Sequence, residues 1–224
     1  MSWSDLTDWW LEEIASDPAY DQMVTPMLLD VLDPEAGKTY LDLGCGEGRV
    51  MRELTMTGAS PIGVEMNLDL ARLAVEAGPV VAGSLPDLGF LRDESVDGAI
   101  CVLVLEHIED HGMLLSEVAR VVKSGGVFAL LMNHPFWTAP GSSPISDADG
   151  EVLWRPGSYF DRGSTLEPAG EDRIEFHHRT TGDLLETAAS VGWSLERMIE
   201  APHHELVDQA GILRLLACRW RLLP

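Results

Sequence analysis

A glycine-rich stretch with two carboxylates offers the clearest chemistry in this sequence. In "YLDLGCGEGRV" an apolar run leads into glycines at every second position from Gly44 to Gly48. Glycines let the backbone turn sharply and let a ligand approach the chain closely. Asp42 precedes these glycines and Glu47 lies among them. Two carboxylates at such a turn would repel a phosphate, and they favour a ligand that carries positive charge.

The same stretch argues against two phosphate-binding motifs. A dinucleotide fingerprint would read Gly-x-Gly-x-x-Gly and would place a pyrophosphate at the helix N-terminus. Here the third glycine, Gly48, comes one residue early. A nucleoside-triphosphate loop would need Gly-Lys-Ser/Thr, which is missing from the stretch. An NAD-dependent oxidoreductase is therefore disfavoured.

Strand-like and helical runs alternate on both sides of this stretch. The strand-like apolar runs cover residues 39–43, 61–65, 80–83, 97–105, 127–132, 194–201 and 212–223. The helical patterns cover residues 48–58, 67–78, 110–126 and 181–192, with Asn67, Asp110 and Thr180 or Thr181 as the expected N-caps. Strands that alternate with helices favour a parallel sheet covered on both faces. The last two strands have no long helix between them, so we expect them to pair antiparallel.

These elements predict one α/β domain over residues 1–224. We expect a doubly wound, mostly parallel seven-stranded sheet with an antiparallel C-terminal hairpin. Apolar residues recur at helical spacing near the N-terminus, so residues 1–37 predict a helical cap. Residues 138–173 follow the fifth strand and are rich in Gly, Pro, Ser and Asp. They predict a long loop-like insert that covers a substrate and packs through its few apolar anchors.

The run "LDLGCGEGR" resembles motif I of the S-adenosylmethionine-dependent methyltransferases with the Rossmann-like fold, in particular the class I small-molecule enzymes. The resemblance extends from about Thr39 to the C-terminus. It implies S-adenosyl-L-methionine as cofactor, a sulfonium with an α-ammonium and no phosphate. It also implies ten donor-binding residues: Asp42, Gly44, Cys45 and Gly46 at the methionyl part, Glu65 at the ribose hydroxyls, Met66, Ser84 and Leu85 at the adenine, and Val102 and Leu103 beneath the sulfonium.

Two histidines are the candidate catalytic residues. Methyl transfer is an in-line displacement at an activated carbon, so an enzyme mainly supplies proximity and alignment. A general base is needed only if the accepting atom carries a proton at the working pH. His107 follows the fourth strand and His134 follows the fifth. The alternative for His107 is a structural role, in which its ring bonds to backbone near the strand end.

Aromatic residues outside the donor motifs predict where an acceptor would bind. The candidate acceptor-binding residues are Tyr20, Phe136, Trp154, Tyr159 and His178, with Trp10 and Trp137 as further aromatic candidates. Aromatic side chains suit a flat or apolar acceptor. The alternative is that the aromatic residues form a small core of the insert and that His178 and Arg179 bond to its backbone.

Charge and cysteine content limit the partners that we expect. The formal net charge is −22, with 15 Lys and Arg against 37 Asp and Glu, which disfavours nucleic acid and anionic membranes. No apolar run reaches the ~18 residues of a membrane span. The N-terminus lacks the basic and apolar regions of a secretory signal, so we expect a cytoplasmic protein. The three cysteines form no Cys-x-x-Cys pair, and neither a metal site nor a disulfide is expected.

The leading hypothesis is a methyltransferase that acts on a small-molecule acceptor, through an O, N or C atom. The run Asn133-His134-Pro135-Phe136 resembles the Asn-Pro-Pro-aromatic signature of amino-group methylation. It follows the fifth strand instead of the fourth, however, so methylation of nucleobases is not expected. The alternative function is a non-catalytic protein that binds S-adenosylmethionine as a regulator or scaffold. A homodimer is left open.

Overall fold

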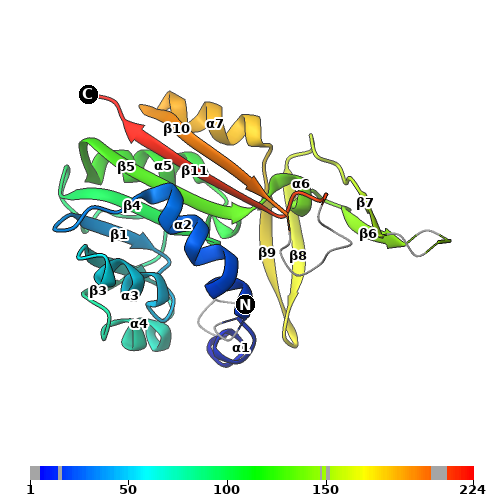
Figure 1. Cartoon of the computed structure of the whole chain (residues 1–224), viewed down its shortest axis with the longest axis horizontal. Helices are drawn as coiled ribbons and strands as arrows, with labels where there is room; N and C mark the ends of the chain where they lie inside the picture. The colour runs from blue at the N-terminus through cyan, green and yellow to red at the C-terminus, as the bar shows by residue number, and fades with distance from the viewer. Residues whose placement is uncertain (1–5, 15–16, 147, 150–151, 203–210) are drawn as a thin grey trace.

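The computed structural model describes residues 6–14, 17–146, 148–149, 152–202 and 211–224 (Figure 1). The helices are α1 (Thr7–Trp9), α2 (Thr25–Leu32), α3 (Arg49–Met56), α4 (Leu68–Ala74), α5 (His111–Val121), α6 (Pro135–Thr138) and α7 (Thr181–Ser190). The strands are β1 (Thr39–Leu43), β2 (Ser60–Glu65), β3 (Val80–Ala82), β4 (Val96–Val102), β5 (Val122–Asn133), β6 (Ser143–Ser146), β7 (Val152–Arg155), β8 (Gly163–Ala169), β9 (Asp172–His178), β10 (Trp193–Ala201) and β11 (Leu215–Leu222). Wide helical turns cover Trp10–Ile14 and Tyr20–Val24, and a tight turn covers Leu105–His107.

The main sheet has seven strands in the order β10-β11-β5-β4-β1-β2-β3. Strands β3, β2, β1, β4 and β5 pair parallel with their neighbours. Strand β11 runs antiparallel to both β5 and β10, which confirms the predicted C-terminal hairpin. The order reverses between β1 and β4, and in open parallel sheets this switch point is where ligands bind, outside the carboxyl ends of the strands.

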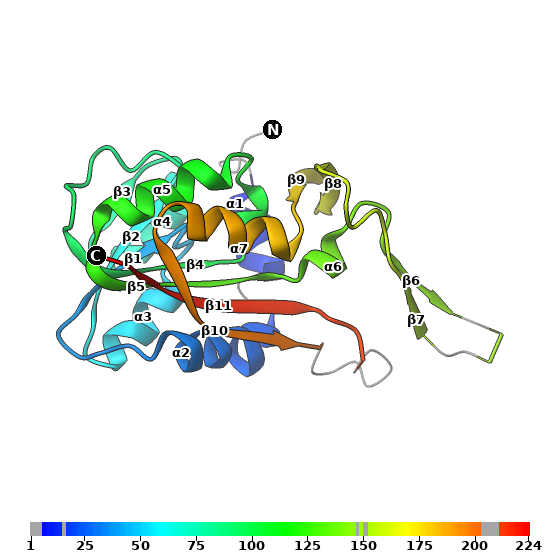
Figure 2. The ribbon, with the colours of Figure 1, turned by 90° about the horizontal axis from the view of Figure 1, so that it is seen from above.

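Helices cover both faces of the sheet (Figure 2). Helices α5 and α7 lie on one face, where Leu115 and Leu184 are buried with Trp193. Helices α2 and α3 lie on the other, where Leu28 and Leu54 are buried against β4, β5 and β11. This arrangement confirms the predicted doubly wound fold. No helix in the described part of the chain is long and apolar enough to cross a membrane.

Several helices begin where the sequence predicts. The Asn67 side chain accepts hydrogen bonds from two backbone N–H groups of α4, and the Asp110 carboxylate accepts one from Met113. The Thr180 hydroxyl accepts the N–H of Asp183 at the start of α7. These oxygens satisfy N–H groups that the first turn of a helix leaves unpaired, and the three predicted caps are confirmed.

The boundary between α5 and β5 differs from the prediction. We expected the helix to continue to Gly126, but it ends at Val121 and β5 begins at Val122. Val122 is fully buried and pairs with Val96, after which the register shifts so that Gly98 pairs with Val127. The pairing and burial of Val122 outweigh the tendency of Gly125 and Gly126 to mark the end of the helix. Both glycines lie in the irregular part of the strand.

The insert after β5 contains two β-hairpins in place of the expected loop. Strand β6 pairs antiparallel with β7, and this hairpin projects away from the sheet in both views (Figures 1 and 2). Strand β8 pairs antiparallel with β9, which continues to His178 beyond the predicted end of the insert. Apolar and polar residues alternate only over short stretches here, and Gly and Pro interrupt them. The sequence pattern therefore did not indicate these strands.

Candidate functional site

Two adjoining cavities lie at the carboxyl ends of β1, β2 and β4. The larger has a volume of about 290 Å³ and the smaller about 30 Å³, and they share Trp10, Gly44 and Gly46 in their walls. All the residues predicted to bind the donor line one or both of them: Asp42, Gly44, Cys45, Gly46, Glu65, Met66, Ser84, Leu85, Val102 and Leu103. We refer to the two together as the donor cavity.

Asp42 places a buried carboxyl at the end of β1. Its side chain is 2% exposed, and its Oδ2 has no hydrogen-bond partner among the described residues. Burial, together with the negative charges of Glu65 and Glu47, raises the pKa of Asp42 to about 8. A cation bound in the cavity would favour the ionised form of this carboxyl and pair with its open oxygen.

Glu65 ends β2 and organises the glycine-rich turn. Its Oε2 accepts the backbone N–H of Gly46 at 2.9 Å and its Oε1 accepts that of Asn67 at 2.8 Å. Burial raises the pKa of Glu65, whereas these backbone hydrogen bonds lower it. Each carboxylate oxygen has a second lone pair, so Glu65 can hold the loop and still accept donors from a ligand.

Close packing explains two of the glycines in the turn. A Cβ on Gly44 would lie 2.6 Å from the side chain of Val104, and one on Gly48 would lie 2.9 Å from the backbone of Ala74 in α4. Both glycines also have positive φ, which other residues adopt at a cost. The turn can therefore approach the segment after β4 and the end of α4 only because these positions carry no side chain.

The N-terminal segment closes one side of the donor cavity. The Trp10 indole N–H donates to Glu47 Oε2 at 2.9 Å, and its ring lies 3.4 Å from where a Cβ of Gly46 would be. Tyr20 lines the smaller cavity, and the Arg49 guanidinium lies 4.8 Å from its ring centre. Trp10 and Tyr20 were candidates for contacting an acceptor, with a contact to the donor's carboxylate as the alternative for Tyr20, and both lie at the donor cavity.

The tight turn after β4 is fixed by a buried arginine. Strand β4 ends at Val102, earlier than predicted, because Leu103 adopts a left-handed conformation with φ of 54°. Arg179 is 4% exposed and donates to the carbonyl oxygens of Leu105 at 2.8 Å and Ile108 at 2.6 Å. These bonds hold the turn that carries Glu106 and His107.

His107 lines the donor cavity from this turn. Its Nδ1–H donates to the carbonyl oxygen of Glu175 at 3.0 Å, so the neutral ring carries its lone pair on Nε2. Burial lowers the pKa of His107 below its ordinary value of 6.5, and the ring is therefore neutral at pH 7. Its ring centre lies 4.6 Å from that of Phe176 in an edge-to-face contact.

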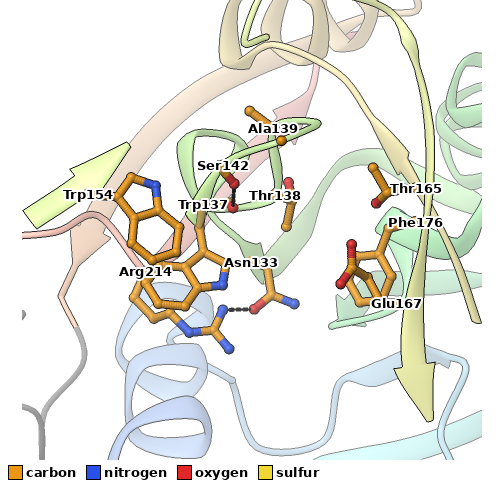
Figure 3. A pocket seen from close by; sticks show the side chains of 11 residues that line it. Asn133, Trp137, Thr138, Ala139, Ser142, Trp154, Thr165, Glu167, Phe176 and Arg214 are labelled. Atoms are coloured by element: carbon orange, nitrogen blue, oxygen red, sulfur yellow. Dashed lines mark hydrogen bonds between the residues drawn. The ribbon is translucent and has the colours of Figure 1, made fainter. Parts of the chain in front are cut away.

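A second cavity of about 270 Å³ lies beyond Phe176, between the end of β5 and the hairpins of the insert (Figure 3). We call it the aromatic cavity, because Trp137, Trp154 and Phe176 line it. Trp137 and Trp154 stack with ring centres 4.0 Å apart. Arg214 also lines this cavity, with its guanidinium 4.5 Å from the Trp137 ring centre, and sequence patterns gave no reason to select it.

Both ring nitrogens of His134, a candidate catalytic residue, have hydrogen-bond partners within the fold. The N–H of Phe136 donates to its Nδ1 at 3.0 Å, so Nε2 carries the proton and donates to Glu200 at 2.8 Å. The ring is 3% exposed and caps the short helix α6. Phe136 does not line the aromatic cavity, whereas its neighbour Trp137 does.

Tyr159 and His178 likewise hold the insert in place of contacting the aromatic cavity. The Tyr159 hydroxyl accepts the N–H of Thr181 at 3.0 Å and donates to its side-chain oxygen. The His178 Nε2–H donates to the carbonyl oxygen of Tyr159 at 2.8 Å. Among the five predicted acceptor residues, Trp154 lines the aromatic cavity, Tyr20 lies at the donor cavity, and the other three are elsewhere.

Comparisons with known proteins agree with this geometry. Residues 41–130 match a family model described as a methyltransferase domain. The ubiquinone biosynthesis O-methyltransferase of Hahella chejuensis is 33% identical over 139 residues, covering 57% of this chain and 58% of that protein. Its namesake from Chromobacterium violaceum is 29% identical over 222 residues, covering 94% and 91%. The chain spans about three fifths of the length of several curated relatives that it matches.

Solved structures share the whole fold. An S-adenosylmethionine-dependent methyltransferase from Mesorhizobium loti superposes with a TM-score of 0.78 at 26% identity, covering 90% of this chain and 99% of that one. The chain is thus similar to the class I S-adenosylmethionine-dependent methyltransferases, enzymes whose methyl donor is S-adenosylmethionine. The open oxygen of buried Asp42 and the carboxylate of Glu65 fit a cationic, phosphate-free ligand of this kind.

Proposed function

We propose that this protein transfers a methyl group from S-adenosylmethionine to a hydroxyl of a small, flat molecule. The observation that carries the proposal is the edge-to-face contact of His107 with Phe176, at 4.6 Å between ring centres. His107 lines the donor cavity and Phe176 lines the aromatic cavity, so this pair connects the walls of the two. In-line transfer requires the acceptor oxygen to touch the methyl carbon, so an acceptor bound in the aromatic cavity would extend its hydroxyl past this pair to the donor.

The donor cavity supplies binding and alignment. Bound there, S-adenosylmethionine would supply an activated methyl group. Asp42 would pair with positive charge on the methionyl part, and Glu65 would accept hydrogen bonds from the ribose hydroxyls. The wall formed by Met66, Ser84 and Leu85 would take the adenine. Trp10 would exclude water from the glycine-rich turn by closing the cavity from the N-terminal side.

His107 is the residue best placed to take a proton from an acceptor hydroxyl. A base must be unprotonated at the working pH, and burial lowers the pKa of His107 and keeps its ring neutral. The bond from Nδ1 to Glu175 orients the ring and leaves the basic lone pair on Nε2. The names of the curated relatives, which specify O-methylation, support a hydroxyl as the accepting group.

The proposal is tested with donor whose methyl group is deuterium-labelled. Purified protein is incubated with this donor and a panel of small aromatic hydroxy compounds, and products are identified by mass spectrometry. We expect the label on the oxygen of at least one compound, in wild-type protein and not in Asp42→Ala. Tight donor binding without transfer to any compound in the panel or in a metabolite extract would favour a non-catalytic binding protein.

A further inference from the structure

The aromatic cavity combines flat walls with one cation. In Figure 3 Trp137 and Arg214 lie on one side, and Phe176 and Glu167 lie on the opposite side. Its volume of about 270 Å³ is near the lower limit for small-molecule pockets. A ligand with one or two rings therefore suits this space, and its faces can lie against the aromatic side chains.

Arg214 directs its charge toward this space. Its Nη1 donates to Asn133 Oδ1, and this is the hydrogen bond that its guanidinium makes within the described part of the chain. A guanidinium has five N–H donors, so the others are available to a ligand in the cavity that Arg214 lines. Paired donors in a planar fork match a carboxylate, and a single donor matches a phenolate.

A relay of hydrogen bonds fixes the arginine in this position. The Asn133 amide accepts from Arg214 through Oδ1, and its Nδ2 donates to Glu106 Oε1 at 2.7 Å. Glu106 is 1% exposed and also accepts the backbone N–H of Asn133 at 3.2 Å. The carboxylate of Glu106 therefore offsets the charge of Arg214 from behind, and the relay orients the guanidinium before a ligand arrives.

Other groups at the cavity limit the ligand further. Trp154 stacks on Trp137 and extends the aromatic wall of the cavity. Glu167 is exposed at the opposite wall and carries a negative charge. A ligand would thus place an acidic oxygen at Arg214 and a hydroxyl or other hydrogen-bond donor at the Glu167 side.

We infer that the acceptor is an aromatic acid: a flat ring that carries an acidic oxygen, held by Arg214 against Trp137. This inference rests on the proposed function, because it assigns the aromatic cavity to the methyl acceptor. Arg214 would be a binding residue that selects the acceptor by charge. Glu106 and Asn133 would act as positioning residues, because they hold the guanidinium of Arg214 toward the cavity.

The experiment measures binding of matched probes by calorimetry. Protein saturated with S-adenosylhomocysteine is titrated with benzoate, 4-hydroxybenzoate and quinoline-2-carboxylate, and with the neutral amide of each. We expect at least one carboxylate to bind about tenfold or more tightly than its amide, the effect of one hydrogen bond to a charged group. Arg214→Gln should remove this preference, and Arg214→Lys should retain part of it.

Controls separate the failure of this inference from that of the proposed function. Arg197 lies on the outer strand β10 and pairs with Asp30 of α2. Arg197→Gln should leave the preference for acids over amides unchanged. S-adenosylhomocysteine should bind wild type and Arg214→Gln equally, which also shows that the variant is folded. Equal binding of acids and amides, binding of none of the probes, or a preference that survives Arg214→Gln would overturn the inference. Loss of S-adenosylhomocysteine binding in wild type would overturn the proposed function itself.

Discussion

The buried carboxyl of Asp42 should couple donor binding to proton release. It is 2% exposed with an unpartnered oxygen among the described residues, and its pKa is raised to about 8. Such a group is mostly protonated at pH 7. When a cationic ligand pairs with it, the carboxyl must ionise, so ligand binding should release a proton and should tighten as the pH rises.

The raised pKa sets the size of this effect. At pH 7 a carboxyl with a pKa of about 8 is ionised in roughly one molecule in eleven, and ionising it costs about 1.4 kcal/mol. Binding at pH 7 should therefore release about 0.9 proton, and affinity should rise about tenfold between pH 7 and pH 9 through this group. Folding stability of the unliganded protein depends on pH in the opposite direction to ligand affinity. The stability from Asp42 is complete below about pH 4 and is lost as the pH rises through 8.

Asp42→Asn provides the comparison. Titration calorimetry with S-adenosylhomocysteine, in buffers of different ionisation enthalpy, gives both the affinity and the number of protons released. The ligand's own ammonium titrates in the same way against both proteins, so the difference between them isolates Asp42. We expect the wild type to bind more tightly at pH 9, with the advantage shrinking toward pH 6. Equal proton release and parallel pH profiles for the two proteins would refute the reasoning.

Three further predictions concern the walls of the donor cavity and the turn after β4. His107→Gln should lower kcat for a hydroxyl acceptor by about 10²- to 10⁴-fold, and wild-type kcat/KM should fall as the pH drops below the lowered pKa of His107; an unchanged pH profile in the variant would exclude His107 as the base. Arg179→Met leaves two carbonyl oxygens unpaired and should lower the free energy of unfolding in urea by about 2–4 kcal/mol; full stability would contradict the role assigned to it. Trp10→Ala should weaken S-adenosylhomocysteine binding by about tenfold or more, and Trp10→Phe much less, since the ring is retained; calorimetry that finds no loss in Trp10→Ala would show that Trp10 does not close the cavity.

The sequence predicted the sheet and the donor cavity because both depend on local patterns. The apolar runs, the glycines from Gly44 to Gly48, and the carboxylates Asp42 and Glu65 lie close to their strand ends in sequence. In a parallel sheet these strand ends meet at one edge, so the residues are brought together by topology alone. Their positions in the cavity follow, and their contacts with a bound donor are still a prediction.

The aromatic cavity could not be predicted in this way, because it depends on contacts between distant segments. Arg214 meets Asn133 across 81 positions of sequence, and Trp154 meets Trp137 through a hairpin. Phe136 and Trp137 were both candidates, and the sequence did not show which of the two lines the cavity. His134 caps α6 at Phe136, and the next residue in this single turn, Trp137, lines the cavity. His178 was selected for its residue type, but its ring bonds to the backbone of the insert.

The central claim is that the donor occupies the donor cavity and the acceptor occupies the aromatic cavity, with the acceptor hydroxyl extending past His107 and Phe176 to the methyl group. The most direct measurement is transfer of a deuterium-labelled methyl group, followed by mass spectrometry, from S-adenosylmethionine to paired aromatic hydroxy acids and their amides. Our account predicts labelled product on the hydroxyl oxygen, with the acid favoured in wild type and the preference lost in Arg214→Gln. Labelled donor that binds but is never consumed, with any of these compounds or with a metabolite extract, would contradict it.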